Sequence, residues 1–280
     1  MSSHEISYLL LGHVTQDLTP EGVVLGGTAA YSALTACALG HPVLLATSYP
    51  EDIQLPSCTH IEIKRTPSEH ATRFENIMVD GKRTQFCYTQ ARELTIENIP
   101  PAWQSSPIIH FGPVAQEIPL QTLRSFSRDA FLCATPQGWM RTWDQEGRVR
   151  PVDWDWAAEA LPSLDAVVLS MEDVGGDERK INDLVQLSKI LVVTEADDGA
   201  RVYWKGDARY FPAPNIPLVD STGAGDIFAA VFFSRFFITK DPWAAAKMAV
   251  QLASLSISRK GLESIPTRQE INQKMVEIIN

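Results

Sequence analysis

The chain has 280 residues, of which 45% are hydrophobic and 21% are charged, and this composition is typical of a globular protein with a sizeable core. Its formal net charge of −10 at pH 7 disfavours nucleic acid and anionic membranes as partners, because like charges repel. No apolar run reaches the roughly 20 residues of a membrane span. The first residues also lack the basic region of a signal peptide, so we expect a cytoplasmic protein.

The first fifty residues follow the order strand, helix, strand. Ile6–Leu11 is a short apolar run. Thr28–Leu39 is rich in Ala and Leu and lies between a Gly-Gly pair and Gly40. Val43–Tyr49 is a second apolar run. This order predicts a parallel sheet covered by helices.

A different pattern occupies residues 61–90. Apolar and polar side chains alternate in Ile61–Lys64 and Thr72–Val79, and more weakly in Thr84–Tyr88. Alternation predicts strands with one buried face, and Asp80-Gly81 between the last two runs is a hairpin signal. We therefore predict a small antiparallel β lid, inserted at about residues 61–90, that projects from the main sheet over a site.

The alternation of strands and helices returns after Pro100-Pro101. Predicted strands are Ile108–Phe111, Phe131–Ala134, Ala166–Leu169, Ile190–Thr194 and Ala200–Trp204. Predicted helices are Leu120–Arg128, Trp154–Leu161, Glu178–Leu187, Gly223–Phe236, Pro242–Ile257 and Arg268–Ile279. The sequence thus predicts one α/β domain over residues 1–280, an αβα sandwich with a mostly parallel central sheet and the small lid.

The cysteines do not form a metal or redox motif. Cys37, Cys58, Cys87 and Cys133 are far apart, and none belongs to a Cys-x-x-Cys pair. Cys37 and Cys133 lie in apolar runs, so we expect buried thiols in a reducing compartment.

The segment Asp220–Asp226 reads Asp-Ser-Thr-Gly-Ala-Gly-Asp and opens a long apolar helix. The first N–H groups of a helix lack internal partners, and the helix dipole is positive there. Gly223, Ala224 and Gly225 are therefore candidates for an anion hole around a transferring phosphoryl group. Asp226 is a candidate base for an attacking hydroxyl. The alternative is a glycine-rich turn in which Asp226 is a helix cap.

The same segment resembles the C-terminal signature of the ribokinase-like (PfkB) carbohydrate kinase family. Gly26–Ala33 resembles the family's N-terminal Gly-Gly signature, and Arg259-Lys260-Gly261 followed by Ile265-Pro266 resembles its ending. The resemblance covers essentially the whole chain. It implies transfer of the γ-phosphoryl group of ATP, with Mg²⁺, to a hydroxyl of a small polyol, sugar or nucleoside. Dependence on a monovalent cation is left open.

On the acceptor side, the resemblance implies substrate-binding roles near the first strand. Gly12 and Asp17 follow this strand, and an ionised Asp17 could accept hydrogen bonds from two substrate hydroxyls. Gly26 and Gly27 would bring backbone N–H groups close to the substrate. The alternatives are a capping Asp and a helix start without a ligand.

Three further residues bear on the choice of acceptor. Tyr31 stands where members that use ribose or fructose have Asn, which weakens a ribokinase assignment. Gln137 and Arg141 follow a strand, where ligands bind in α/β folds, although a solvated loop is the alternative. The segment Pro136–Arg141, together with the Ser170-Met-Glu-Asp variant and the short lid, resembles the myo-inositol-kinase-like branch of the family. A nucleoside would need an aromatic platform, for which the lid offers Phe74, Phe86 and Tyr88.

On the donor side, the resemblance implies a metal site and a nucleotide site. Ser170-Met-Glu-Asp stands where the family has Asn-x-x-Glu, so Glu172 or Asp173 would organise Mg²⁺ and its waters, unless the two are a capping pair. Thr194 to Gly199 stand where the family has Thr-x-Gly-x-x-Gly, with Ala196 in place of the first Gly. The predicted cofactor-binding residues are Thr194, Gly199, Thr222 and Gly261.

Two other classes of protein are alternatives to a kinase. A non-catalytic ligand-binding protein on a kinase fold would account for Ser170, Ala196 and Tyr31. A dinucleotide-dependent dehydrogenase is excluded, because no Gly-x-Gly-x-x-Gly follows the first strand. Only a short segment separates Asp17 from Gly26, which leaves little room for lid strands there, so a monomer or weak homodimer is expected.

Overall fold

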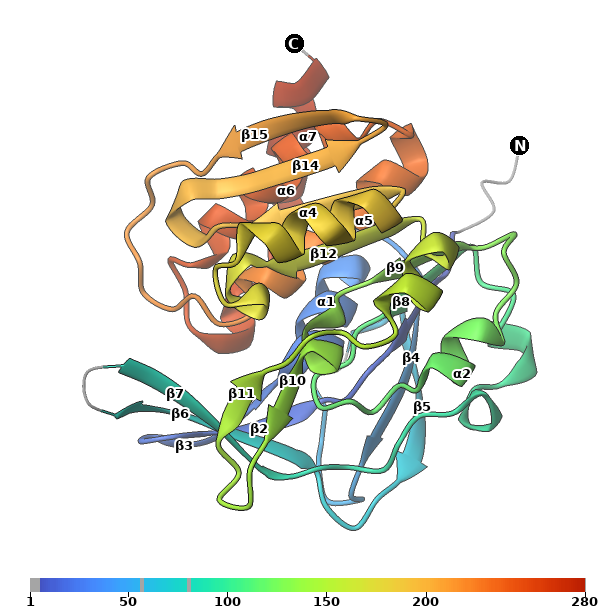
Figure 1. The fold of residues 1–280 in the computed structure, drawn as a ribbon, viewed down its shortest axis with the longest axis vertical. Helices are drawn as coiled ribbons and strands as arrows, with labels where there is room; N and C mark the ends of the chain where they lie inside the picture. Colours follow the sequence, from blue (N-terminus) through green and yellow to red (C-terminus); the bar gives the residue numbers. More distant parts are fainter. Residues whose placement is uncertain (1–5, 56–57, 80–81, 280) are drawn as a thin grey trace.

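The structure is a computed structural model and describes residues 6–55, 58–79 and 82–279. Its centre is a nine-stranded sheet in the order β15-β14-β13-β12-β9-β8-β1-β4-β5 (Figure 1). Every pairing from β13 to β5 is parallel, and only β14 and β15 are antiparallel to their neighbours. The strands are β1 (Tyr8–Leu11), β4 (Val43–Tyr49), β5 (Ile61–Pro67), β8 (Ile108–Phe111), β9 (Phe131–Ala134), β12 (Ala166–Ser170), β13 (Ile190–Thr194), β14 (Gly199–Trp204) and β15 (Asp207–Pro212).

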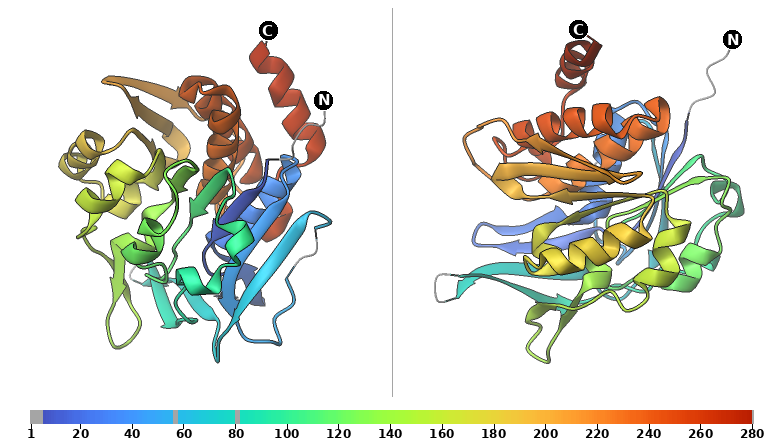
Figure 2. Two further views of the ribbon diagram at one scale, coloured as in Figure 1. Left: turned by 90° about the vertical axis from the view of Figure 1, so that its right-hand side faces the viewer. Right: turned by 45° about the horizontal axis from the view of Figure 1, so that its top comes forward.

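Helices cover both faces of this sheet (Figure 2). One layer contains α1 (Gly27–Ala38), α5 (Ala224–Thr239), α6 (Pro242–Ser256) and α7 (Arg268–Ile279), and the other contains α2 (Leu120–Arg124), α3 (Ala157–Ala160) and α4 (Glu178–Leu187). The side chains of β1 point alternately to the two faces of the sheet. Tyr8 and Leu10 pack in the core beneath the first helix layer, and Leu9 and Leu11 pack in the core beneath the second. The predicted αβα sandwich is confirmed.

The lid is a separate four-stranded sheet in the order β3-β2-β6-β7, which projects from the main sheet (Figure 1). Its strands are β2 (Thr15–Thr19), β3 (Gly22–Gly26), β6 (Thr72–Val79) and β7 (Lys82–Thr89). The two hairpins are antiparallel, and β2 pairs with β6 in parallel.

The expected lid at about residues 61–90 is therefore corrected in two respects. Ile61–Pro67 is not part of the lid, because β5 pairs with β4 at the edge of the main sheet. Residues 15–26 supply half of the lid, because a tight turn between Thr19 and Gly22 fits two strands into this short segment. The reason for expecting a monomer, a lid too small to associate, is removed with it. The proposed Asp80-Gly81 turn lies outside the described residues.

Shorter elements complete the chain. A two-stranded sheet joins β10 (Arg141–Trp143) to β11 (Val149–Pro151). The predicted helix at Leu120–Arg128 ends at Arg124, and the one at Trp154–Leu161 consists of α3 and a 3₁₀ turn. The 3₁₀ turns are η1 (Ile96–Asn98), η2 (Pro101–Trp103), η3 (Pro136–Met140), η4 (Leu161–Ser163), η5 (Met171–Val174), η6 (Ala196–Asp198) and η7 (Gly261–Ser264). Within the described ranges, no helix is long and apolar enough to cross a membrane.

The cysteines were expected to be thiols, and this expectation is wrong for two of the four. Cys37, at the end of α1, is joined to Cys58, just before β5, by a disulfide. The packing of the 50s loop against α1 brings the two residues together, and no sequence motif marks them. Cys87 and Cys133 are free and buried, as expected for thiols in apolar surroundings.

Candidate active site

The two glycine signatures meet where α1 and α5 begin. Asp226 lies in the first turn of α5, and its Oδ1 accepts a hydrogen bond from Thr28 Oγ1 in the first turn of α1 (2.7 Å). Ser32 Oγ donates to the carbonyl oxygen of Asp226 (3.1 Å). Thr28 was not predicted, although its place directly after Gly26-Gly27 was a usable signal. The contact between the two helices fixes the carboxylate and leaves Oδ2 for another partner.

The surroundings of Asp226 make it a stronger base than an ordinary carboxylate. Burial raises its pKa to about 6, and the charges of Asp173 and Asp17 act in the same direction. The hydrogen bond from Thr28 and the charge of Arg141 oppose this rise. A carboxyl group with this pKa is mostly ionised at pH 7 and can still take a proton from a hydroxyl.

The start of α5 offers backbone donors to an anion. Gly223 precedes the helix with φ +80°, and a Cβ there would collide with the ring of Tyr31. Ala224 N–H donates to the Ser221 carbonyl (3.2 Å). Among the described residues, the N–H groups of Gly225 and Asp226 have no acceptor, and a Cβ on Gly225 would meet nothing within 4 Å. In the segment predicted to form an anion hole, the N–H group of Ala224 is thus engaged, while those of Gly225 and of the adjoining Asp226 are available to an anion.

Asp220 holds the segment before α5 against the segment after α6. Its Oδ1 accepts from Thr222 N (2.9 Å) and its Oδ2 from Gly261 N (3.1 Å). Burial would raise the pKa of Asp220, but the hydrogen bonds from Thr222 and Gly261 and the charge of Lys260 outweigh burial and lower it. Two of the predicted cofactor residues, Thr222 and Gly261, therefore lie together, and the space around the Gly261 Cα is open.

The other two predicted cofactor residues lie at the end of β13 and the start of β14. Thr194 Oγ1 donates to the Leu169 carbonyl (3.4 Å). Gly199 has φ +109°, and a Cβ there would collide with the Phe211 carbonyl on β15. The close pairing of β14 and β15 therefore explains why glycine is needed at position 199, even if no ligand binds there.

The Ser170–Asp173 segment forms a reciprocal cap at the carboxyl end of β12. Asp173 Oδ2 accepts from Ser170 N (2.8 Å), and Ser170 Oγ accepts from Glu172 N (3.2 Å). Burial raises the pKa of Asp173, while its hydrogen bonds with Ser170 and Gln137 and the charge of Arg141 lower it in part. Glu172 is exposed, whereas Asp173 is partly buried and close enough to Asp226 to raise the pKa of that carboxyl.

These residues fit a weakly held Mg²⁺. In the part of the chain that is described, no group of three or more His, Cys, Asp or Glu side chains could hold a metal by itself. Mg²⁺ commonly keeps several waters and binds through one or two carboxylates together with phosphates. Asp173 can supply one such carboxylate. Its hydrogen bond with Ser170 is also the one expected if Glu172 and Asp173 are only a capping pair.

Arg141 connects the site with the lid. Its side chain is only 7% exposed. Nη1 donates to Gln85 Oε1 on β7 (2.6 Å), and the guanidinium lies 5.2 Å from the centre of the Phe74 ring on β6. Burial lowers the pKa of Arg141, while Asp173, Glu117, Cys87 and Asp226 raise it. The buried, positively charged Arg141 thus lies near Asp173 and Asp226. The sequence pattern did not predict its partner Gln85.

Asp17 lies on lid strand β2. Its Oδ1 accepts from Thr15 Oγ1 (2.8 Å), and its Oδ2 lies where a Cβ on Gly26 would be. Gly27 has φ +83°, so both residues of the pair must be glycine for a geometric reason. Gly12 is accounted for by packing, because a Cβ there would collide with the Gly112 carbonyl.

Tyr31 lies between the acceptor and donor sides. Its side chain is buried against Gly223. Burial and the charges of Asp220, Asp17 and Asp226 raise its pKa above the usual range, so it stays neutral. The ring fills the space beside Gly223, which the shorter side chain of an Asn would not reach in the same way.

A cavity of about 850 Å³ lies elsewhere, at the amino ends of β9, β12 and β13. None of the candidate site residues lines it. Its lysines already have partners: Lys189 pairs with Asp165 (2.8 Å), Lys205 lies 4.4 Å from the Trp204 ring centre, and Lys240 lies 4.3 Å from that of Phe237. The candidate site is thus at the opposite, carboxyl edge of the sheet, where α/β folds bind ligands.

The chain is similar in sequence to known carbohydrate kinases. The family model "pfkB family carbohydrate kinase" matches residues 170–268. A fructokinase of Escherichia coli is 28% identical over 131 residues, which is 41% of this chain and 43% of that protein. The chain therefore spans less than half the length of this relative.

Two solved structures share the fold. A pyrophosphate-dependent kinase of the ribokinase family, complexed with a pyrophosphate analog and myo-inositol, has a TM-score of 0.81 at 21% identity and covers 95% of this chain and 99% of its own. A fructokinase with bound ATP from Xylella fastidiosa has a TM-score of 0.75 at 17% identity and covers 99% and 100%. The fold, the two glycine signatures and the family match over residues 170–268 therefore all resemble those of ribokinase-like (PfkB) carbohydrate kinases.

Proposed function

We propose that this protein is a kinase that transfers the γ-phosphoryl group of ATP to a hydroxyl of a sugar or cyclitol. The observation that carries the proposal is Asp226, a carboxylate with a pKa of about 6 held beside the free N–H groups at the start of α5. A base next to an anion hole is the minimum arrangement for phosphoryl transfer to an alcohol. The family relationship supports the same activity.

Each group has a separate task in the proposed reaction. Asp17 and the backbone at Gly26-Gly27 orient the acceptor. Asp226 takes the proton of the attacking hydroxyl on Oδ2, because Thr28 occupies Oδ1. The N–H groups of Gly225 and Asp226 stabilise the charge on the phosphoryl oxygens. Mg²⁺, when bound, would neutralise phosphate charge, and Asp173 is the residue that would hold it or one of its waters.

Within the acceptor class, we favour a cyclitol similar to myo-inositol. Such a ring carries several hydroxyls and no charge, which suits Asp17, Gln137 and Arg141. The structural relative that binds myo-inositol supports this choice. A nucleoside is less well served, because Phe74 lies against Arg141, and Phe86 stacks on Tyr88 with ring centres 6.0 Å apart.

The alternative is a non-catalytic binding protein on the same fold. It is motivated by Ser170, Ala196 and Tyr31, which depart from the family pattern. The intact contact between Thr28 and Asp226 argues for catalysis, because binding alone would not need a positioned base. The cytoplasmic location, the small-molecule acceptor as partner and the monomer or weak homodimer remain predictions.

The test is acceptor-dependent release of ADP from Mg·ATP, or of phosphate from Mg·pyrophosphate. The acceptors are myo-inositol, other cyclitols, ribose, fructose and nucleosides, and Asp226→Asn is the matched control. We expect one strong acceptor, and a loss of about 10³-fold in kcat in the variant. If no acceptor stimulates turnover while ATP still binds, the binding-protein alternative is correct. A variant that keeps more than about a tenth of kcat contradicts the role of Asp226 as base.

A further inference from the structure

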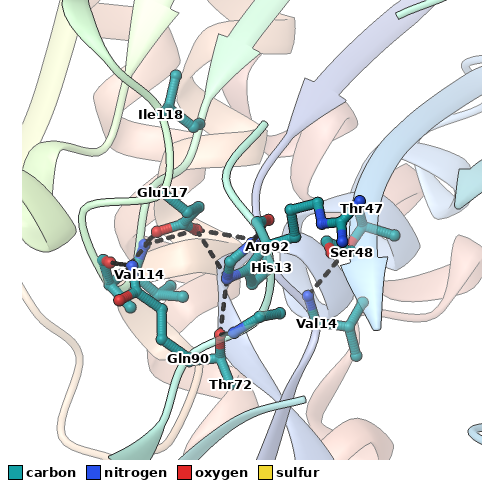
Figure 3. A network of polar contacts seen from close by, with 12 residues as sticks. His13, Val14, Thr47, Ser48, Thr72, Gln90, Arg92, Val114, Glu117 and Ile118 are labelled. Atoms are coloured by element: carbon teal, nitrogen blue, oxygen red, sulfur yellow. Dashed lines mark hydrogen bonds and ion pairs between the residues drawn. The ribbon is translucent and has the colours of Figure 1, made fainter. Parts of the chain in front are cut away.

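The chain passes four times between the main sheet and the lid, and all four crossings lie around His13. His13 itself lies between β1 and β2, and its carbonyl would be 2.7 Å from a Cβ on Gly27, where β3 meets α1. Its side chain contacts the entry to β6 at Thr72 and the exit from β7 at Arg92. His13 and Thr72 are both fully buried. Figure 3 shows His13 with these partners around it.

The hydrogen-bond directions around His13 are mutually consistent. Nε2 lies 2.9 Å from the Arg92 carbonyl, which can only accept, so Nε2 carries a proton. In the neutral imidazole, Nδ1 then accepts from Thr72 Oγ1 (2.6 Å), and Thr72 Oγ1 accepts from Ala91 N (2.9 Å). One side chain thereby ties both ends of the β6–β7 hairpin to the end of β1.

Glu117 anchors this arrangement from the other side (Figure 3). Its side chain is fully buried. Oε1 accepts from His13 N (3.0 Å), Oε2 accepts from Ala115 N (2.6 Å), and Val114 N donates to both oxygens (3.0 Å each). A buried carboxylate is tolerated because these donors replace water.

The segment held by Glu117 also reaches the candidate site. Gln116 Nε2 donates to the Arg141 carbonyl (2.6 Å). Val114 and Ala115 pack with Phe74 and Cys87 of the lid in one small apolar cluster. The position of the lid, and with it Asp17 on β2 and Gln85 on β7, therefore depends on the same corner that holds Arg141 in place.

We propose that His13 and Glu117 are positioning residues that hold the lid at a fixed angle over the acceptor. They act through Asp17 and Gln85 on the lid and therefore on acceptor binding, while the hydrogen bond from Thr28 that positions Asp226 and the donor-side contacts of Asp220 involve no lid residue. The kinetic part of this inference rests on the proposed kinase function. The structural part, that His13 governs the stability of the lid, does not.

The test compares His13→Leu with His41→Leu. His41 is also a buried histidine that makes two side-chain hydrogen bonds, to the Ile6 carbonyl (2.8 Å) and to Ser234 Oγ (2.6 Å), and no lid residue is among these partners. Both variants should lower the urea midpoint. Only His13→Leu should speed amide hydrogen exchange in β6 and β7, by about 10-fold or more relative to β8 and β9, and raise the acceptor KM about 10-fold with kcat within about 3-fold.

Two milder variants test the inference in case His13→Leu does not fold. Glu117→Gln keeps the shape of the side chain but replaces one acceptor oxygen by a donor, and should give the same lid-specific exchange. His13→Gln, whose amide can still donate to the Arg92 carbonyl, should restore part of the acceptor KM.

The two proposals fail in distinguishable ways, because hydrogen exchange requires no turnover. Faster lid exchange in a protein that phosphorylates no acceptor would support the positioning role and contradict the kinase function. Lid exchange that is unchanged in both His13→Leu and Glu117→Gln, or equally faster in His41→Leu, overturns the inference. So does a His13→Leu enzyme that loses kcat at an unchanged acceptor KM.

Discussion

Gly223 and Gly225 lie two positions apart at the start of α5 and meet different physical requirements. Gly223 is needed for the fold, because its backbone is left-handed and the Tyr31 ring occupies the place of a Cβ. Gly225 is not needed for the fold, because a Cβ there points into open space. That open space, in front of two unpaired N–H groups, is where a phosphoryl group would lie.

The two alanine variants should therefore differ. Gly223→Ala should lower the free energy of unfolding by about 1–3 kcal/mol. Gly225→Ala should leave it unchanged or raise it by up to about 1 kcal/mol, because Ala is the better helix residue, yet its methyl group should reduce kcat about 100-fold or more by entering the anion hole. Urea denaturation and steady-state kinetics check both statements. An active Gly225→Ala enzyme would place the phosphoryl group elsewhere.

Asp226 should make the ligand-free protein less stable as the pH rises. Its folded pKa of about 6 is above the ordinary value of 3.8, so the folded state binds the proton more tightly than the unfolded state. The stabilisation by the protonated form is complete below pH 4 and is lost between pH 4 and 6.

Asp226→Asn should remove this dependence. We expect it to be more stable than the wild type by about 1–3 kcal/mol at pH 8 and no more stable at pH 4. Thermal unfolding without nucleotide or metal, at a series of pH values, measures the difference. In the active enzyme, kcat/KM should fall below about pH 6, as Asp226 is protonated. A pH-independent difference in stability would contradict the raised pKa.

At the scale of elements, Asp220 joins the start of α5 to η7 through one carboxylate. It accepts from the backbone N–H groups of Thr222 and Gly261, which lie 2 and 41 residues away from it along the chain and are brought together by the fold. We therefore expect donor binding to depend on this bridge, because both segments carry predicted cofactor residues.

Removing the Asp220 bridge should affect donor binding. Asp220→Ala should raise the donor KM about 10-fold and leave the acceptor KM within about 3-fold. Asp241→Ala is the matched control, because Asp241 also accepts from two backbone N–H groups, those of Trp243 (2.9 Å) and Ala244 (3.2 Å), at the start of α6. Both variants should lose about 1 kcal/mol of stability. An equal rise of the donor KM in both would show that general loosening, and not the bridge, is responsible.

Helices and strands with a strong local sequence pattern were predicted well. Strands whose place depends on a neighbouring strand were not. β4, β8, β9, β13 and α4 have the predicted bounds, because continuous apolar runs or a clear amphipathic period define them. β15 was missed, because an edge strand needs few apolar residues once β14 offers it hydrogen bonds. β5 was assigned to the wrong sheet, because alternation indicates a half-exposed strand and not its neighbour.

At the scale of the whole molecule, the disulfide leaves two free thiols. Cys87 is 3% exposed and Cys133 is fully buried, and burial raises the pKa of both thiols. We expect no reaction of the native, non-reduced protein with a thiol reagent. After unfolding without reductant two thiols should react, and after reduction all four cysteines should. Four reactive thiols without reductant would show that Cys37 and Cys58 are not joined.

The sequence by itself determined the class of fold and the two glycine signatures, because apolar periodicity and glycines with fixed backbone requirements are local properties of the chain. It also marked Asp226, Asp17 and Arg141 as site residues. Only the tertiary structure decided that Thr28 holds Asp226, that Asp173 lies close to Asp226, and that His13 contacts both Glu117 and the lid. These contacts link residues far apart in the sequence, so no local pattern contains them, and only the packed fold brings their atoms within hydrogen-bonding distance.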